Sequence, residues 1–138
     1  MNLEKINHIG IAVANLEESI HQYQQLGFTF HGTEEVSEQK VMTAFFEIGE
    51  SHIELLEATA EDSPIAKFLQ KRGPGIHHIC IQVDDIDAAL QRYREAGLRL
   101  VNEQPVIGAG GHRVAFIHPK STSGVLIEVL ETKKTHAE

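Results

Sequence analysis

Two histidines and two glutamates recur at matching places in the two halves of the sequence. His8 and His78 are seventy positions apart, and each is followed by apolar residues one, three and five positions later. Glu54 and Glu128 lie in the similar segments IELLE and IEVLE. Imidazole and carboxylate ligands without a thiolate suit a catalytic divalent metal such as Zn, Co, Ni, Mn or Fe. The repetition therefore predicts a metal site made of these four residues.

A structural role is the competing interpretation for each residue taken alone. A single His on a strand is more often a hydrogen-bonded structural residue than a ligand, and this chain has nine histidines. Glu57 and Glu131 are interpreted as solvated carboxylates, and Glu54 and Glu128 could be of the same kind. The joint recurrence of His and Glu favours metal binding over these alternatives.

Two further histidines lie close to the predicted ligands in the sequence. His77 precedes His78, and strand alternation directs the two side chains to opposite faces, so His77 is assigned a structural role. His52 shares the face of Glu54 and could line the same site. Its place in the second half is taken by Leu126, so His52 is not counted among the ligands.

The first half of the sequence predicts a strand, a helix and three more strands. The alternating run 6–13 is typical of a strand with one apolar face. A helix follows, with Asn15 as its N-cap and Gly27 after its C-terminus. The remaining strands are predicted over 28–36, 41–48 and 51–57.

The same pattern restarts in the second half. The alternating run 76–83 opens it, and the nineteen-residue interval from His8 to Gly27 recurs between His78 and Gly97. Such internal repetition indicates a duplicated structural unit. Strands are predicted over 98–102, 113–118 and 125–131.

A linker separates the two repeats. Residues 59–75 contain a short predicted helix over 63–69, with Ser63 as cap and Pro64 at its first position. After the linker and the next strand, Asp84 and Asp85 are the candidate caps of the second long helix.

The repeats predict an α+β fold made of tandem βαβββ modules. The expected domain covers 1–138, with a first module over 6–58, the linker over 59–75 and a second module over 76–131. Two modules edge to edge would give a curved, mixed eight-stranded sheet that forms a cup, with the helices on its convex face. A pseudo-twofold axis between the modules would gather the two His and two Glu residues in the cup.

Composition narrows the class of protein. The chain has 138 residues, 41% of them hydrophobic, and a formal charge of −8. Phosphate backbones require a basic face, so nucleic acid is not expected as a partner. The single cysteine, Cys80, fits a reducing compartment, and no run approaches the roughly 18–20 apolar residues of a membrane span. With no signal peptide at its start, the protein is expected in the cytoplasm.

Three segments carry a resemblance to a known family: 62–69 (DSPIAKFL), 75–80 (GIHHIC) and 116–128 (FIHPKSTSGVLIE). With them, the chain resembles the vicinal oxygen chelate (glyoxalase/bleomycin resistance) superfamily from His8 to Glu131. Within it, the chain is similar to the methylmalonyl-CoA epimerases. The resemblance implies metal ligands at His8, Glu54, His78 and Glu128; some epimerases have Gln at the place of Glu54.

The resemblance implies a proton transfer at C2 of an acyl-CoA. An epimerase interconverts (R)- and (S)-methylmalonyl-CoA by removing this proton and returning it to the other face, through a metal-stabilised enolate. Glu128 is the expected base, alternating between ligand and base. Glu54 is the first candidate on the opposite face and a metal-bound water the second. Thr43 stands where some epimerases have a further Glu.

The CoA moiety would need polar and basic contacts. Lys120 and Ser121, before the last strand, and Arg113, near the glycine-rich turn, are candidates for phosphate or pantetheine binding. The alternative is that the loop is only a turn, with Lys120 as its solvated tip.

Other functions share this ligand pattern. A glyoxalase I-type lactoylglutathione lyase is the second candidate, because metal-dependent glyoxalases use the same His/Glu/His/Glu set. A ring-opening dioxygenase is less favoured, because such enzymes usually have three ligands. A non-catalytic ligand-binding member of the superfamily is a further alternative. Exposed strand edges favour a homodimer.

Overall fold

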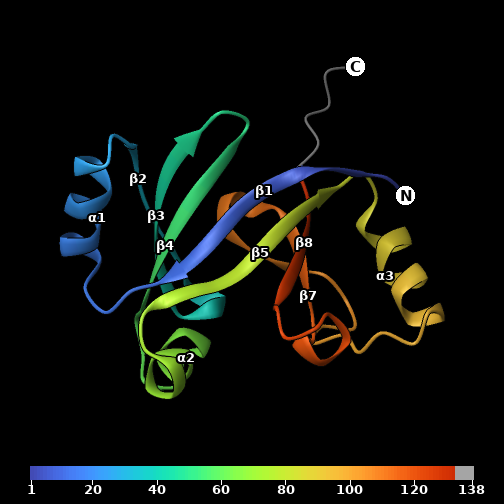
Figure 1. The fold of residues 1–138 in the computed structure, drawn as a ribbon. Helices are drawn as coiled ribbons and strands as arrows, with labels where there is room; N and C mark the ends of the chain where they lie inside the picture. Colours follow the sequence, from blue (N-terminus) through green and yellow to red (C-terminus); the bar gives the residue numbers. More distant parts are fainter. Residues whose placement is uncertain (133–138) are drawn as a thin grey trace. The chain divides into compact units, whose positions relative to one another are not determined.

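The computed structural model describes residues 1–132. Eight strands, three α-helices and three short 3₁₀ helices follow one another along this part of the chain (Figure 1). Their bounds are β1 Leu3–Ala12, α1 Leu16–Gln25, β2 Thr29–Val36, η1 Ser37–Gln39, β3 Val41–Ile48, β4 Ser51–Ala58, α2 Pro64–Arg72, β5 Gly75–Val83, α3 Ile86–Glu95, β6 Val106–Ile107, η2 Ala109–Gly111, β7 Arg113–Ile117, η3 Pro119–Ser121 and β8 Ile127–Glu131.

The two repeats have the same strand pairing. In the first, the order is β2-β3-β4-β1, with β1 parallel to β4 and β3 antiparallel to β2 and β4. In the second, the order is β6-β7-β8-β5, with β5 parallel to β8 and β7 antiparallel to β6 and β8. The predicted α+β class and the tandem βαβββ arrangement are confirmed. By compactness the chain divides into Asn7–His78 and the remainder.

One predicted strand differs from the structure. Within 98–102 only a single bridge forms, between Leu100 and Ile117, and the strand bonded to the outer edge of β7 is Val106–Ile107. The side chain of Asn102 explains the interruption, because its Oδ1 accepts the Phe116 N–H at 2.8 Å. A side chain thus replaces the backbone carbonyl that would continue the ladder.

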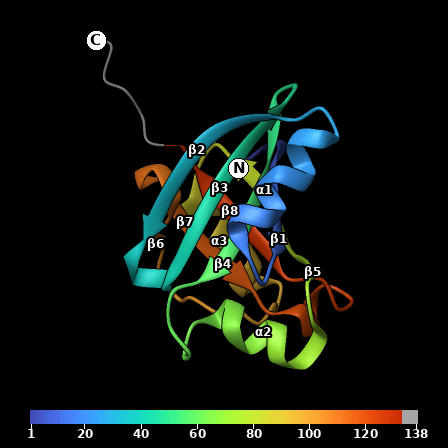
Figure 2. The ribbon, with the colours of Figure 1, turned by 90° about the vertical axis from the view of Figure 1, so that its left-hand side faces the viewer.

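The core of the first repeat lies between α1 and its strands (Figure 2). Phe46 is fully buried, and the ring of Tyr23 from α1 packs against it at 5.8 Å between centroids. On β4, Ile53 and Leu55 belong to this core. Because side chains alternate along a strand, Glu54 is directed to the face that α1 does not cover.

The core of the second repeat is built in the same way. Ile86 and Leu90 of α3 are buried with Val129 of β8 and with Ala115 and Ile117 of β7. The alternation along β8 therefore directs its intervening residue, a glutamate, away from α3.

Each long helix begins with two side-chain caps. Asn15 Oδ1 accepts from Glu18 N at the start of α1, and Asp85 Oδ1 accepts from Ala88 N at the start of α3. These assignments confirm Asn15 and select Asp85 over Asp84. Such caps satisfy N–H groups that have no partner within the helix.

A second cap in each repeat corrects an interpretation made from the sequence. Glu57 Oε2 accepts from Leu16 N at 3.2 Å, and Glu131 Oε2 accepts from Ile86 N at 3.0 Å. These carboxylates, at the ends of β4 and β8, are therefore not simply solvated. Each adds a negative charge at the positive end of a helix dipole.

The linker helix is longer than predicted. α2 runs over Pro64–Arg72, and Ser63 Oγ caps it by accepting from Ile65 N at 3.1 Å. Gly73, at φ 75°, ends the helix in a conformation that glycine adopts readily. No helix within residues 1–132 is long and apolar enough to cross a membrane.

Candidate active site

The two predicted histidine ligands face each other. His8 on β1 and His78 on β5 are both buried, and their Nε2 atoms lie 3.1 Å apart. Nitrogen ligands about 2.1 Å from a metal and at right angles to each other are about 3 Å apart. The separation of the two nitrogens therefore fits two adjacent ligand positions on one ion.

The proton on His8 can be placed from its neighbours. Its Nδ1 lies 2.7 Å from Asn7 Oδ1 and 3.2 Å from Glu54 Oε2. Both oxygens are acceptors, so Nδ1 carries the proton and donates it. In the neutral ring, Nε2 then presents a lone pair toward His78, which is the form that binds a metal.

Gly10 makes room for the ring of His78. A Cβ at position 10 would lie 2.2 Å from Cε1 and 2.6 Å from Nδ1 of this imidazole. Real Cβ atoms do not approach other atoms so closely. Strand alternation in the sequence places Gly10 on the same face as His8. It does not predict the contact with His78, because a close approach between two strands leaves no periodic pattern in the sequence.

Glu54 is held by two imidazoles. This buried carboxylate accepts from His52 Nε2 at 2.9 Å through the same Oε2 that faces His8. The rings of His8 and His52 stack at 5.1 Å with an interplanar angle of 26°. His8, His52 and Glu54 each offer one ligand atom, and these three atoms lie within 4.8 Å of one another, so the three residues could hold a metal ion. His52 therefore lies with His8 and Glu54, although it has no counterpart in the second half of the sequence.

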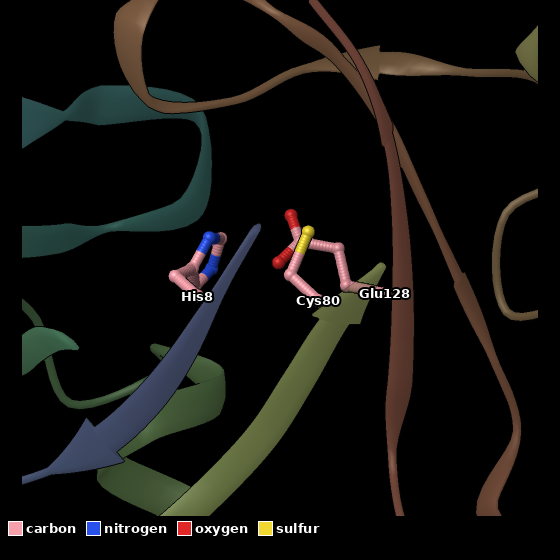
Figure 3. A group of neighbouring side chains, drawn as sticks. All are labelled: His8, Cys80 and Glu128. Atoms are coloured by element: carbon pink, nitrogen blue, oxygen red, sulfur yellow. The ribbon is translucent and has the colours of Figure 1, made fainter. Parts of the chain in front are cut away.

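Glu128 lies on β8, opposite Cys80 of the adjacent strand β5 (Figure 3). Both residues are buried. The Cys80 Sγ and a Glu128 carboxylate oxygen are within 4.8 Å of each other. Of the four predicted ligands, His8, Glu54 and His78 lie within the unit Asn7–His78, and Glu128 belongs to the remainder of the chain.

The predicted substrate contacts lie along β7 and the loop that follows it. Arg113 donates to Asp87 at 2.9 Å and to Glu131 at 3.4 Å, so carboxylates already balance its charge. Hydrogen bonding to Asp87 is the main reason that the pKa of Arg113 is raised. A phosphate group would have to compete with both carboxylates.

Lys120 and Ser121 lie in the short helix η3. The Lys120 side chain is exposed, and Ser121 Oγ accepts from Arg99 N at 2.8 Å. Lys120 N donates to His118 Nδ1 at 3.0 Å, which requires a neutral imidazole. Desolvation and the positive charges of Arg99 and Lys120 lower the pKa of His118, consistent with this role. The loop therefore offers an exposed cation on a hydrogen-bonded frame.

Comparison with known proteins identifies the class. The sequence profile of the Glyoxalase/Bleomycin resistance protein/Dioxygenase superfamily matches residues 7–116. Together with the paired βαβββ modules and the His and Glu residues described above, this match shows that the chain belongs to that superfamily.

Within the superfamily, the chain is similar to methylmalonyl-CoA epimerases. It is 42% identical to the human mitochondrial methylmalonyl-CoA epimerase over 130 residues, which cover 93% of this chain and 74% of that one. A solved structure of methylmalonyl-CoA epimerase with methylmalonyl-CoA and NH4+ matches with a TM-score of 0.91 and 38% identity, covering 95% and 96% of the two chains. A lactoylglutathione lyase of Haemophilus influenzae is 34% identical, with 95% of each chain covered.

Proposed function

We propose that this protein is a metal-dependent epimerase that interconverts (R)- and (S)-methylmalonyl-CoA. The observation that carries the proposal is the pair of Nε2 atoms of His8 and His78, 3.1 Å apart and beside Glu54. This pair occurs in a chain that is 42% identical to the human epimerase. The similarity to lactoylglutathione lyases is weaker, which favours an acyl-CoA substrate.

His8, Glu54, His78 and Glu128 would hold the metal, for which Co, Zn, Ni and Mn are the candidates. The contacts of the first three within one compact unit support their assignment. The assignment of Glu128 rests on its matching place in the sequence repeat. When bound, a divalent metal supplies Lewis-acid stabilisation of the negative charge that develops on the substrate oxygens.

Two groups would transfer the C2 proton, one on each face of the substrate. General acid–base catalysis by a positioned carboxylate contributes roughly 10²–10⁴-fold to the rate. Glu128 is proposed as the base that removes or returns the proton. Glu54 is the candidate for the opposite face, although its contacts with His8 and His52 favour a fixed position.

The CoA phosphates would bind near η3. Lys120 is exposed and is proposed to contact a phosphate, with Ser121 beside it. Arg113 is the weakest of the three proposed contacts, because Asp87 and Glu131 already accept from its guanidinium. Charge reversal at Lys120 should therefore raise KM more than removal of Arg113.

Proton exchange at C2 tests the reaction directly. Metal-loaded protein is incubated with methylmalonyl-CoA in deuterated buffer, and the C2 proton is followed by NMR. Enzyme-dependent loss of the C2 signal is expected, faster than loss of the proton in buffer alone. If the metal-loaded protein does not accelerate exchange, this proposal is wrong.

A glyoxalase I-type lyase is the second candidate, because a lactoylglutathione lyase matches 95% of this chain. Assaying the hemithioacetal of glutathione in parallel separates the two enzymes. A purely ligand-binding role would be indicated by protein that is isolated without metal in chelator-free buffers and whose C2 exchange is unchanged by His78→Ala. We also propose a cytoplasmic homodimer, which sedimentation can test.

A further inference from the structure

The backbone of Arg99 is held against the loop that contains η3. Arg99 N donates to Ser121 Oγ at 2.8 Å, and His118 N donates to Arg99 O at 2.8 Å. The two groups are thus bonded to residues on either side of Lys120. All four residues belong to the same compact unit of the chain. An arginine that is distant in the sequence is therefore brought beside the lysine that is proposed to contact a phosphate.

The charges of Arg99 and Lys120 both act on His118. Desolvation lowers the pKa of this histidine most, and the two positive charges lower it further. In the part of the chain that the structure describes, neither cation is paired with a carboxylate. Arg113, by contrast, donates to two carboxylates. Two unbalanced cations therefore lie together on this loop, in a chain with a formal charge of −8.

His118 adds a neutral donor to the two cations. Its Nδ1 accepts from Lys120 N at 3.0 Å, so the hydrogen of the neutral ring is on Nε2. The loop thus offers a guanidinium, an ammonium and an imidazole N–H. A guanidinium can donate to two phosphate oxygens at once, and an ammonium acts as a point charge. This set of donors suits a phosphate group.

We propose that Arg99, together with Lys120 and the Nε2–H of His118, binds a phosphate group of CoA. The inference rests on the proposed function, because it takes an acyl-CoA as the substrate. Arg99 would act on substrate binding and not on proton transfer at C2, because the phosphates of CoA are remote from its thioester. Ser121 has a second role here, since its Oγ holds the backbone of Arg99.

Calorimetry with CoA tests this site without turnover. Arg99→Gln removes the guanidinium, and we expect CoA binding to weaken about tenfold at low ionic strength. Arg92→Gln removes an exposed arginine of α3 in the same unit and is the matched control, with an expected change within about twofold. Added salt should reduce the difference between the two variants, because it screens contacts between exposed charges.

A substitution at His118 separates the donor from the frame of the loop. In His118→Asn, the amide oxygen takes the place of Nδ1 and can still accept from Lys120 N, whereas the Nε2–H is lost. We expect CoA affinity to fall about threefold, which corresponds to the loss of one hydrogen bond. An unchanged affinity would contradict the part of the proposal that concerns His118.

The phosphate that is bound can be identified with 3′-dephospho-CoA. An effect of Arg99→Gln that disappears with this ligand would assign the site to the 3′-phosphate. An effect that persists would assign it to the diphosphate. Either outcome supports the proposal, because both place a phosphate of CoA at Arg99.

Two results would overturn the inference: equal CoA affinity in the wild type and Arg99→Gln, or no measurable binding of CoA by the wild type. Both are distinct from failure of the reaction. Protein that binds CoA through Arg99 but does not exchange the C2 proton would contradict the epimerase proposal and leave this site intact. Accelerated exchange with the same KM for methylmalonyl-CoA in the wild type and Arg99→Gln would do the reverse.

Discussion

The two repeats share their supporting structure but differ around their carboxylates. Each has a proposed ligand histidine on its first strand and a glutamate on its last strand, and the glutamate is directed away from the helix. Next to these positions the repeats diverge: the first has Gly10 and His52 where the second has Cys80 and Leu126. The duplication has therefore kept the framework and the ligand types, while the immediate surroundings of the ligands have changed.

This divergence suggests different roles for the two carboxylates. Glu54 accepts from His52 and His8, which fix its orientation. Glu128 lies beside the thiol of Cys80, which is buried with Val114 and Leu130. A carboxylate that is held by two imidazoles suits a fixed ligand, which leaves Glu128 as the proposed proton-transfer group.

Replacing each carboxylate by its amide should have the largest and most unequal effect. Glu128→Gln removes the proposed base and should slow C2 exchange by about 10²–10⁴-fold. Glu54→Gln keeps an oxygen ligand and should lose much less activity than Glu128→Gln. Equal losses in the deuterium exchange assay would contradict the division of roles.

Gly10 and Cys80 occupy matching positions in the two repeats, and Gly10 is the one with no room for a side chain. Alanine there would meet the ring of His78 at 2.2 Å, so we expect Zn²⁺ affinity to fall by about 10–100-fold in calorimetry. Gly10 does not have a positive φ, so alanine would not strain the backbone there and the effect would come from this contact. Cys80→Ala, at the matching position, is the control and should stay within about threefold. A normal affinity in Gly10→Ala would show that the ring relocates without consequence.

Making the first repeat resemble the second at position 52 should have a smaller effect. His52→Leu, which copies the residue type of Leu126, removes one of the two donors to Glu54 and should weaken Zn²⁺ binding by about tenfold. His52→Gln retains a donor and serves as the conservative control. An unchanged affinity in His52→Leu would mean that His8 alone holds the carboxylate.

The helix caps should respond alike, because here the repeats match. Asn15→Ala and Asp85→Ala each remove one acceptor at a helix N-terminus, and each should lower the free energy of unfolding by about 1 kcal/mol. Urea denaturation of the metal-free protein measures both. Metal affinity should not change in either variant, and a selective loss in one would indicate that its helix also supports the ligands.

Periodicity in the sequence predicted the framework well. Alternation placed Glu54 and Glu128 opposite the helices, and turn and cap residues located α1 and α3. These features depend on local geometry, which leaves a regular pattern along the chain. The repeat also showed which residues of the two halves correspond, because equivalent residues lie seventy or seventy-four positions apart.

The contacts that sequence reasoning missed depend on the reach of individual side chains. Alternation gives the face of a residue, but not that His77 touches Nδ1 of His78 or that Gly10 lies under its ring. Likewise, Asn102 ends a predicted strand by accepting one N–H. Each depends on distances between segments that are set only when the chain has folded.

The glutamates at the ends of β4 and β8 also have a consequence for how the chain assembles. Leu16 is separated from Glu57 by 41 positions, and Ile86 from Glu131 by 45. The first N–H of each helix therefore acquires its partner only when the last strand of the same repeat is in place. Closing such a loop costs entropy before the contact forms. In each repeat, this hydrogen bond therefore couples the start of the helix to the end of the last strand.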